Sequence, residues 1–297
     1  MKIETHSNLH VTNVTTPTSS KSDKVTEKSP SNAEKVSNTN TRARMLGWFA
    51  QAGIRPTGSF NHQEVDREAI RRRQISAQRK VQNLQKILDL ALDFSTEQSK
   101  ADALDPDWFF SFISMAEDIY SPAMQELWGK IFAVEIARAG SFSLRSLQTL
   151  KQLTQRDAKM FYAASCLVSK RVGEHSAKIL YGYYQKPSVW SFLGSSKLHQ
   201  LNLAHFGLPY PDLLALMEMG LIYRSEIESG ELDPQHATQW RCGSGVLNLV
   251  AKRRGITLNY YKFTPTGEEL LRLVNPKPNM HYLDELKVLL NSGFLLS

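Results

Sequence analysis

The chain has 297 residues, of which 41% are hydrophobic and 22% charged, and a formal net charge of +7, as expected for a globular protein of about two compact domains. Its two cysteines, Cys166 and Cys242, are too few and too far apart for a disulfide framework or a metal site, and they suit a reducing compartment. The N-terminus lacks an apolar signal segment and no run approaches the ~20 apolar residues of a membrane span, so we expect a cytoplasmic protein.

The charge is distributed unevenly along the chain. Residues 1–61 and 62–90 are basic, residues 91–150 carry nine acidic and four basic residues, and residues 151–297 are basic again. These regions could bind one another or an acidic partner, and they are equally consistent with a solvated surface of mixed sign.

Residues 1–41 are rich in Ser, Thr, Asn and Lys and contain no aromatic residue. Such a segment buries too little apolar area to offset its ordering entropy, so we expect a disordered basic tail. Residues 42–61 follow, with an apolar group among three arginines: Met45, Leu46, Trp48 and Phe49. We interpret them as a short anchor that packs on the rest of the chain. The alternative, a membrane-surface helix, is disfavoured by two glycines.

A long helix is predicted from about residue 62 to residue 94, a range without proline or glycine. Its apolar positions follow heptad-like steps: Ile70, Ala77, Val81, Leu84, Leu88 and Ala91. This seam, residues 70–91, is typical of a coiled coil or of one face of a helical bundle, and we expect any homo-oligomer to form through it. The three arginines 71–73 wind around the helix and indicate first a solvated surface and only second a nucleic-acid contact.

Further helices are predicted in the rest of a helical domain, residues 62–152. Asp105 and Pro106 have the chemistry of an N-cap and a first helical position, and Ser121-Pro122 begins the next helix. Gly140 suits the left-handed residue that ends that helix, and Ser143 suits the N-cap of the helix after it.

Glu135 and Arg145 bracket this helix-to-helix corner. We predict that they form a structural ion pair; a ligand-binding role and no interaction are the alternatives. Neither residue has a nucleophile, a metal ligand or a second carboxylate beside it in the sequence, so they do not indicate catalysis.

The corner also carries a recognisable pattern, W-x-K-I, an acidic residue and G-S-F-S-x-R-x-L. The matching residues are Trp128, Lys130, Ile131, Glu135, Gly140, Ser141, Phe142, Ser143, Arg145 and Leu147. The pattern resembles the signature of a bacterial family of unknown function, and the similarity extends from about residue 105 to the C-terminus. The resemblance implies no known activity, cofactor or partner, so we interpret the motif as structural.

Residues 153–275 are predicted to form a winged-helix-like module. A capping-box start at Thr154–Asp157 begins one helix, and a leucine-rich helix ends at Gly220. Two strands within 245–262 then flank the turn 252–255 as a small β-hairpin. With a last helix in 276–297, the predicted fold class is mostly α (α+β).

The charges of this module bear on a DNA-binding interpretation. The helix that would enter the major groove, residues 211–219, carries two acidic residues and no basic one, so phosphate would repel it. The predicted wing tip instead carries Lys252, Arg253 and Arg254, which are candidate phosphate contacts.

We therefore expect a non-enzymatic binding or assembly protein whose winged-helix-like module contacts a protein partner or a second copy. The alternative is a nucleic-acid-binding regulator that contacts phosphate through Lys252–Arg254 and the basic N-terminal arm. A second alternative is an enzyme or effector with a site that the sequence does not reveal. No catalytic motif occurs, and the glycine-rich Cys242–Gly245 indicates a turn leading into a strand rather than a phosphate loop, so we predict no catalytic residue, metal or cofactor.

Overall fold

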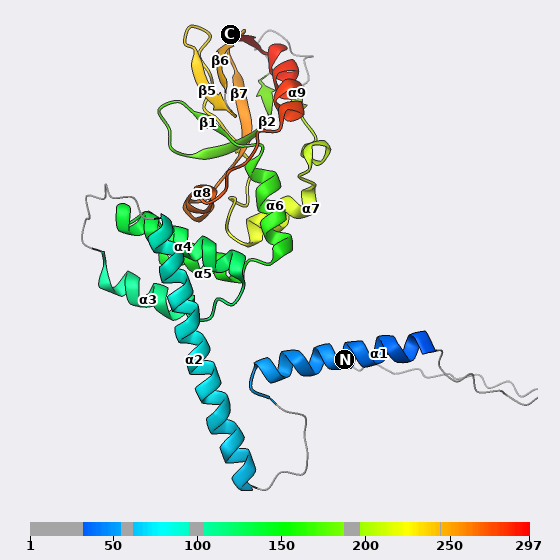
Figure 1. Cartoon of the computed structure of the whole chain (residues 1–297). Helices are drawn as coiled ribbons and strands as arrows, with labels where there is room; N and C mark the ends of the chain where they lie inside the picture. Colours follow the sequence, from blue (N-terminus) through cyan, green and yellow to red (C-terminus); the bar gives the residue numbers. More distant parts are fainter. Residues whose placement is uncertain (1–31, 55–61, 95–103, 187–196, 244) are drawn as a thin grey trace, which may run out of the picture. The chain divides into compact units, whose positions relative to one another are not determined.

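Figure 1 shows the computed structural model of the chain, which describes residues 32–54, 62–94, 104–186, 197–243 and 245–297. The chain forms two compact units, Met1–Arg73 and Gln74–Ser297. The boundary falls within one long helix, α2 (His62–Phe94), which has the bounds that the absence of proline and glycine predicts.

The first unit contains helix α1 (Asn32–Gln51) and the first turns of α2. The predicted disordered tail, residues 1–41, is wrong over residues 32–41, which are helical; residues 1–31 lie outside the described residues. Within residues 32–41 only Ala33, Glu34 and Lys35 are good helix formers, and the helix continues from them into the apolar group. In the predicted anchor, residues 42–61, the side chains of that apolar group are exposed, residues 55–61 lie outside the described residues, and docking stays a prediction.

The helical part of the second unit follows α2. Its helices are α3 (Pro106–Ala116), α4 (Pro122–Ala137), α5 (Leu144–Gln152) and α6 (Gln155–Ser165). Three of them begin at the predicted caps. Asp105 accepts the Asp107 N–H at 2.9 Å, Ser143 accepts the Ser146 N–H at 3.3 Å, and Thr154 forms a complete capping box.

Aromatic side chains form the centre of this helical layer. The ring of Phe112 lies 5.2 Å from the rings of Trp108, Trp128 and Phe132, measured between centroids. Helix α4 also approaches α2 closely, because a Cβ on Gly129 would lie only 2.9 Å from the Cβ of Leu90. Close packing of this kind makes α3, α4 and the second half of α2 one core.

The rest of the second unit is built on one antiparallel sheet, which has eight strands among the described residues. They are β1 (Ser169–Arg171), β2 (Ala177–Gln185), β3 (Lys197–Gln200), β4 (Ile227–Glu228), β5 (Thr238–Cys242), β6 (Gly245–Ala251), β7 (Ile256–Lys262) and β8 (Phe294–Leu296). Their order is β4-β7-β2-β1-β5-β6-β8, and β3 pairs with the second half of β2. Helices and sheet together confirm a mixed α+β fold.

The pairing of these strands corrects the predicted small β-hairpin. Strands β6 and β7 exist where expected, but β6 pairs with β5 and β8, whereas β7 pairs with β2 and β4. The observed hairpin is β5–β6, which closes at the pair Cys242–Gly245, and Gly243 in its turn has φ +60°. The turn prediction for Cys242–Gly245 is therefore confirmed. The winged-helix-like module lacks its predicted wing, because Lys252–Gly255 connects β6 and β7, which do not pair with each other.

This short link requires a curled sheet. Strands β6 and β7 are four strand spacings apart in the sheet order, which is about 19 Å if the sheet is flat. The four linking residues turn at Gly255, where φ is +79°, and cannot extend over that distance. The sheet therefore curls until the end of β6 approaches the start of β7.

The predicted C-terminal helix is present as α9 (Met280–Asn291), and it packs on β2 and β8 beside the sheet (Figure 1). The fully buried Tyr282 donates its hydroxyl to the Leu180 carbonyl at 2.6 Å. At the other end, the hydroxyls of Tyr183 and Ser292 are 2.6 Å apart. These contacts hold α9 along the central strand.

The remaining helices are η1 (Leu203–Phe206), α7 (Tyr210–Glu218) and α8 (Pro265–Leu271). Gly220 follows α7 with φ +71°, as predicted for the residue that ends it. Figure 1 shows α6, α7 and α8 between the sheet and helices α3–α5. Helix α8 packs on α5, so it joins the sheet to the helical layer.

Candidate functional site

The corner, residues Arg138–Ser143, contains four of the ten residues of the predicted family motif. Glu135 of α4 is only 3% exposed and directs its carboxylate at the corner backbone: Oε1 accepts the Gly140 N–H at 2.5 Å and Oε2 the Phe142 N–H at 2.9 Å. The predicted ion pair with Arg145 is wrong, since no ion pair among the described residues joins the two. The physical reason is that both carboxylate oxygens already accept backbone hydrogen bonds, while Arg145 is exposed on α5.

Other elements hold the same corner from both sides. Trp108 of α3 donates its indole N–H to the Phe142 carbonyl at 2.7 Å. From beyond α8, Arg272 donates to the Ser141 carbonyl at 2.9 Å, and the Ser143 N–H donates to the α8 carboxylate of Glu269 at 2.6 Å. The Ser141 hydroxyl donates to the Arg138 carbonyl at 2.6 Å. The corner is thus a joint between four helices, and its polar groups are used in holding them.

The motif residues Trp128 and Lys130 lie away from the corner. Trp128 is fully buried in the aromatic core. Lys130 forms an ion pair with Glu126 at 2.7 Å, and its ammonium lies 4.8 Å from the centre of the Phe94 ring. Neither arrangement provides a reacting group, so the motif residues do not assemble into a catalytic centre.

The predicted phosphate contacts Lys252, Arg253 and Arg254 are all exposed in the β6–β7 link. Lys252 is engaged at the end of α9: its ammonium donates to the Asn291 carbonyl at 2.6 Å and its backbone N–H to the Gly293 carbonyl at 2.9 Å. The pKa of Asp233 is lowered, first by the N–H of Gln235 and to a smaller extent by the charge of Arg254. Lys252, and more weakly Arg254, therefore interact with the structure around the link.

Helix α2 presents two apolar faces within the second unit. One face is buried in the unit's own core and includes Asn83, Ile87 and Ala91. The other face we call the α2 stripe, and its residues are Ala77, Val81, Leu88 and Leu92. Val81 is 55% exposed, Leu88 50% and Leu92 61%. The predicted seam is thus divided: Leu84 and Ala91 pack internally, whereas Val81 and Leu88 are exposed.

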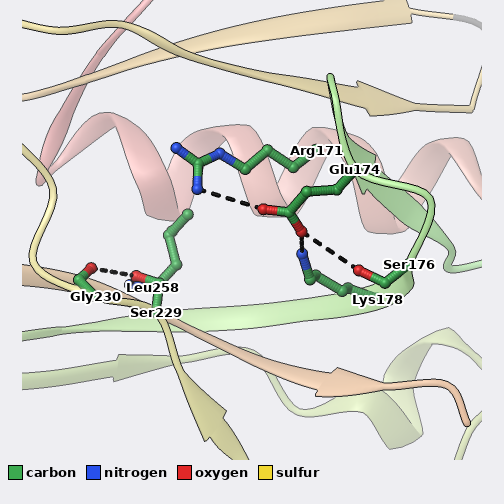
Figure 2. Close-up of polar contacts among 7 residues, drawn as sticks. All are labelled: Arg171, Glu174, Ser176, Lys178, Ser229, Gly230 and Leu258. Carbon is green, nitrogen blue, oxygen red and sulfur yellow. Dashed lines mark hydrogen bonds and ion pairs between the residues drawn. The ribbon is translucent and has the colours of Figure 1, made fainter.

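A polar cluster that no sequence motif predicted lies at the turn between β1 and β2 (Figure 2). Lys178 of β2 is 4% exposed, and its ammonium lies 5.2 Å from the ring centre of Trp240 and 5.1 Å from that of Tyr260. It forms an ion pair with Glu174, which also bonds Arg171 at 3.4 Å. The Lys178 hydrogen bond lowers the pKa of Glu174, so the carboxylate stays ionised. Lys178 packs against the rings of Trp240 and Tyr260, which are far from it in the sequence, so the local sequence does not indicate that it is buried.

A second polar group joins β2 and β7. The hydroxyls of Tyr181 and Tyr261 both donate to Glu226, at 2.6 and 2.7 Å, and their rings stack at 4.9 Å. Burial, followed by the Glu226 carboxylate, raises the pKa of both tyrosines. The adjoining cavity of about 150 Å³ is smaller than typical ligand sites of about 300–1,000 Å³. This group is therefore best explained as a strand-to-strand bridge.

Within the described ranges, no helix is both long and apolar enough to cross a membrane. The same residues contain no group of three or more His, Cys, Asp or Glu side chains placed to hold a metal ion.

Comparison with known proteins gives one result. Residues 66–287 match the family described as "Protein of unknown function (DUF2806)". The match covers most of the chain, so the chain belongs to this family, and the resemblance to a family of unknown function is confirmed. Searches of curated proteins and of solved structures found no match.

Proposed function

We propose that this member of the DUF2806 family is a non-enzymatic assembly protein that pairs with a second copy of itself through the α2 stripe. The observation that carries the proposal is the exposure of Val81, Leu88 and Leu92 on a helix whose other face already packs in its own core. Apolar residues at coiled-coil spacing on a solvent-facing helix are typical of association between helices.

The spacing of the α2 stripe supports a second copy as the partner. Its steps of four, seven and four residues are the same in both chain directions. A twofold axis through the middle of the stripe therefore places Ala77 opposite Leu92 and Val81 opposite Leu88 in an antiparallel pair. Such a contact is self-complementary, as closed homodimers require.

The side chains beside the stripe also support self-association. Gln74, Gln78 and Gln85 each lie three residues before a stripe position, and all three are exposed. Residues three apart are neighbours on a helix surface, so a row of three glutamines, followed by Asp89 three residues before Leu92, borders the stripe. Two copies can approach along this row without bringing like charges together.

The contact is small, so we expect a weak dimer that forms in a concentration-dependent manner. Only three large apolar side chains and one alanine per copy take part. We place the assembly in the cytoplasm, in line with the free thiols Cys166 and Cys242.

Light scattering of the full chain over a concentration series tests the proposal. We expect the mass of the wild type to rise towards that of a dimer, and Leu88→Lys to weaken the association at least tenfold. Val288→Lys is the matched control, because Val288 is an apolar residue 72% exposed on α9. A monomer at every concentration, or an equal effect of both substitutions, would contradict the proposal. Leu84→Lys is a poorer probe, because Leu84 packs against the core.

The second candidate function is nucleic-acid binding through the β6–β7 link and the basic N-terminal arm. It is favoured by the exposure of three consecutive cations and by the net charge of +7. Because Lys252 donates to Asn291, the phosphate contacts would depend mainly on Arg253 and Arg254. Salt-sensitive binding of a random duplex, weakened by alanine at these two arginines, would favour this candidate.

A further inference from the structure

Two cations lie directly opposite each other on neighbouring strands. Lys170 of β1 and Arg241 of β5 are partners in the antiparallel register, so their side chains leave the same face of the sheet. Both are exposed, and neither forms an ion pair with any residue that the structure describes. Like charges at directly opposed positions destabilise a sheet. The arrangement is unfavourable for the empty protein and becomes favourable when an anion is bound.

Lys170 and Arg241 also line two cavities, one on each side. The larger, of about 270 Å³, is mostly apolar, with Val168, Pro276 and Pro278 in its walls. The smaller, of about 220 Å³, continues along the β1–β2 turn. Lys170 and Arg241 therefore line both a mostly apolar cavity and a polar cavity.

The polar cavity reinforces the positive charge. Its wall includes Arg171 and Glu174, and Glu174 is held by Arg171 and by the buried Lys178 (Figure 2). Because the carboxylate is neutralised by these partners, it does not offset the charges of Lys170 and Arg241. Among the charged residues that line this cavity, Lys170, Arg171 and Arg241 carry three positive charges and Glu174 carries one negative charge, and a concave surface focuses the resulting potential.

We propose that Lys170 and Arg241 bind the phosphate group of a small organic phosphate, whose apolar or aromatic body lies against Pro276 and Pro278. Arginine presents a planar fork that matches phosphate oxygens in pairs, and lysine adds a compact charge beside it. The larger cavity is close to the lower limit of ligand sites, so it suits a small body such as a single ring.

Calorimetric titration of the full chain with phenyl phosphate, inorganic phosphate and phenol tests the site. Phenyl phosphate is expected to bind saturably and about tenfold or more tightly than inorganic phosphate, because the ring removes apolar surface from water. Phenol is expected to bind too weakly to measure. Arg241→Gln should weaken phenyl phosphate binding at least tenfold, and Arg224→Gln, a change at an exposed arginine between α7 and β4, should leave it unchanged.

The stability of the empty protein provides a second readout. Relief of the opposed charges should make Lys170→Gln raise the midpoint of thermal unfolding by about 1–2 °C while it weakens binding. A residue with a purely structural role would instead lower that midpoint. The proposal is overturned if phenyl phosphate shows no saturable binding, if it binds no more tightly than inorganic phosphate, or if Arg241→Gln and Arg224→Gln behave alike.

Discussion

Glu135 shows how one buried carboxylate can organise a helix-to-helix corner without taking part in chemistry. Its two oxygens accept the N–H groups of Gly140 and Phe142, which would otherwise be unpaired donors where the chain turns. Gly140 itself has φ +76°, a conformation in which a residue with a Cβ is strained. The sequence pattern correctly located the corner and its glycine. It assigned the wrong partner to the carboxylate, because backbone donors leave no mark in the sequence.

We expect Glu135→Gln to lower the free energy of unfolding by about 1–3 kcal/mol, because the amide keeps one acceptor and turns a donor towards a backbone N–H. Arg145→Ala, the matched control, should change it by less than about 0.5 kcal/mol, because Arg145 is exposed. Urea unfolding of both variants and of the double variant measures these effects. Additive losses are predicted. The Glu135–Arg145 ion pair would be supported instead if Arg145→Ala alone clearly destabilised the protein and the double variant were no less stable than Glu135→Gln.

At the scale of elements, the helices were the predictable part. Their ends are set by side chains a few residues away, such as Asp105, Ser143 and the Thr154–Asp157 capping box, so the local sequence contains the information. The long α2 was predictable for the same reason, since a helix needs only its own residues to close its hydrogen bonds.

Strand pairing was the part that could not be predicted. The links at Gly243 and at Lys252–Gly255 both contain a glycine with positive φ, so each is a plausible hairpin turn. Only the curl of the whole sheet decides that β6 pairs with β5 and β8 instead of β7. The central strand β2 was not predicted either, because the strands that pair with it come from three separate parts of the chain.

The turn between β1 and β2 gives a prediction at this scale, because Glu174 holds it to the sheet through Lys178. Glu174→Gln leaves a buried ammonium without its carboxylate and should destabilise the protein at pH 7. Such a loss can reach about 3–5 kcal/mol in a fully buried pair. We expect about 1–3 kcal/mol here, because Glu174 is 39% exposed and solvent screens the pair. Glu228→Gln, at an exposed acid on β4, is the control and should have little effect.

The pH dependence of this difference follows from the lowered pKa of Glu174. A carboxyl whose pKa is lower in the folded state stabilises the fold fully above its ordinary pKa of about 4.5, and the contribution is lost as the pH falls through the folded-state pKa. The stability gap between wild type and Glu174→Gln should therefore be constant from pH 7 to about pH 5 and shrink below it. A gap that stays constant down to pH 3 would show that the carboxylate is not its source.

At the scale of the whole molecule, the sequence indicated the proposed association surface only in part. The heptad-like seam placed it on α2, but periodicity cannot tell which apolar residues a helix shares with its own core. Ile87 and Ala91 are buried there, and the more exposed Val81 and Leu88 remain for a partner. The proposed anion site could not be predicted from the sequence, because Lys170 and Arg241 are 71 residues apart and only the sheet register brings them together.

The most direct test of the assembly is the distance between spin labels on the α2 helices of two copies. Labels are placed singly at the exposed Gln85 or Gln74, in a chain with Cys166 and Cys242 replaced by alanine. Gln85 lies at the centre of the proposed antiparallel pair, so its labels should be close, separated by little more than a helix spacing of about 10 Å and the label arms. Gln74 lies about ten residues from the centre, so its labels should be about 30 Å apart along the axis. Equally short distances at both positions, or no distance between copies at either, would contradict the account.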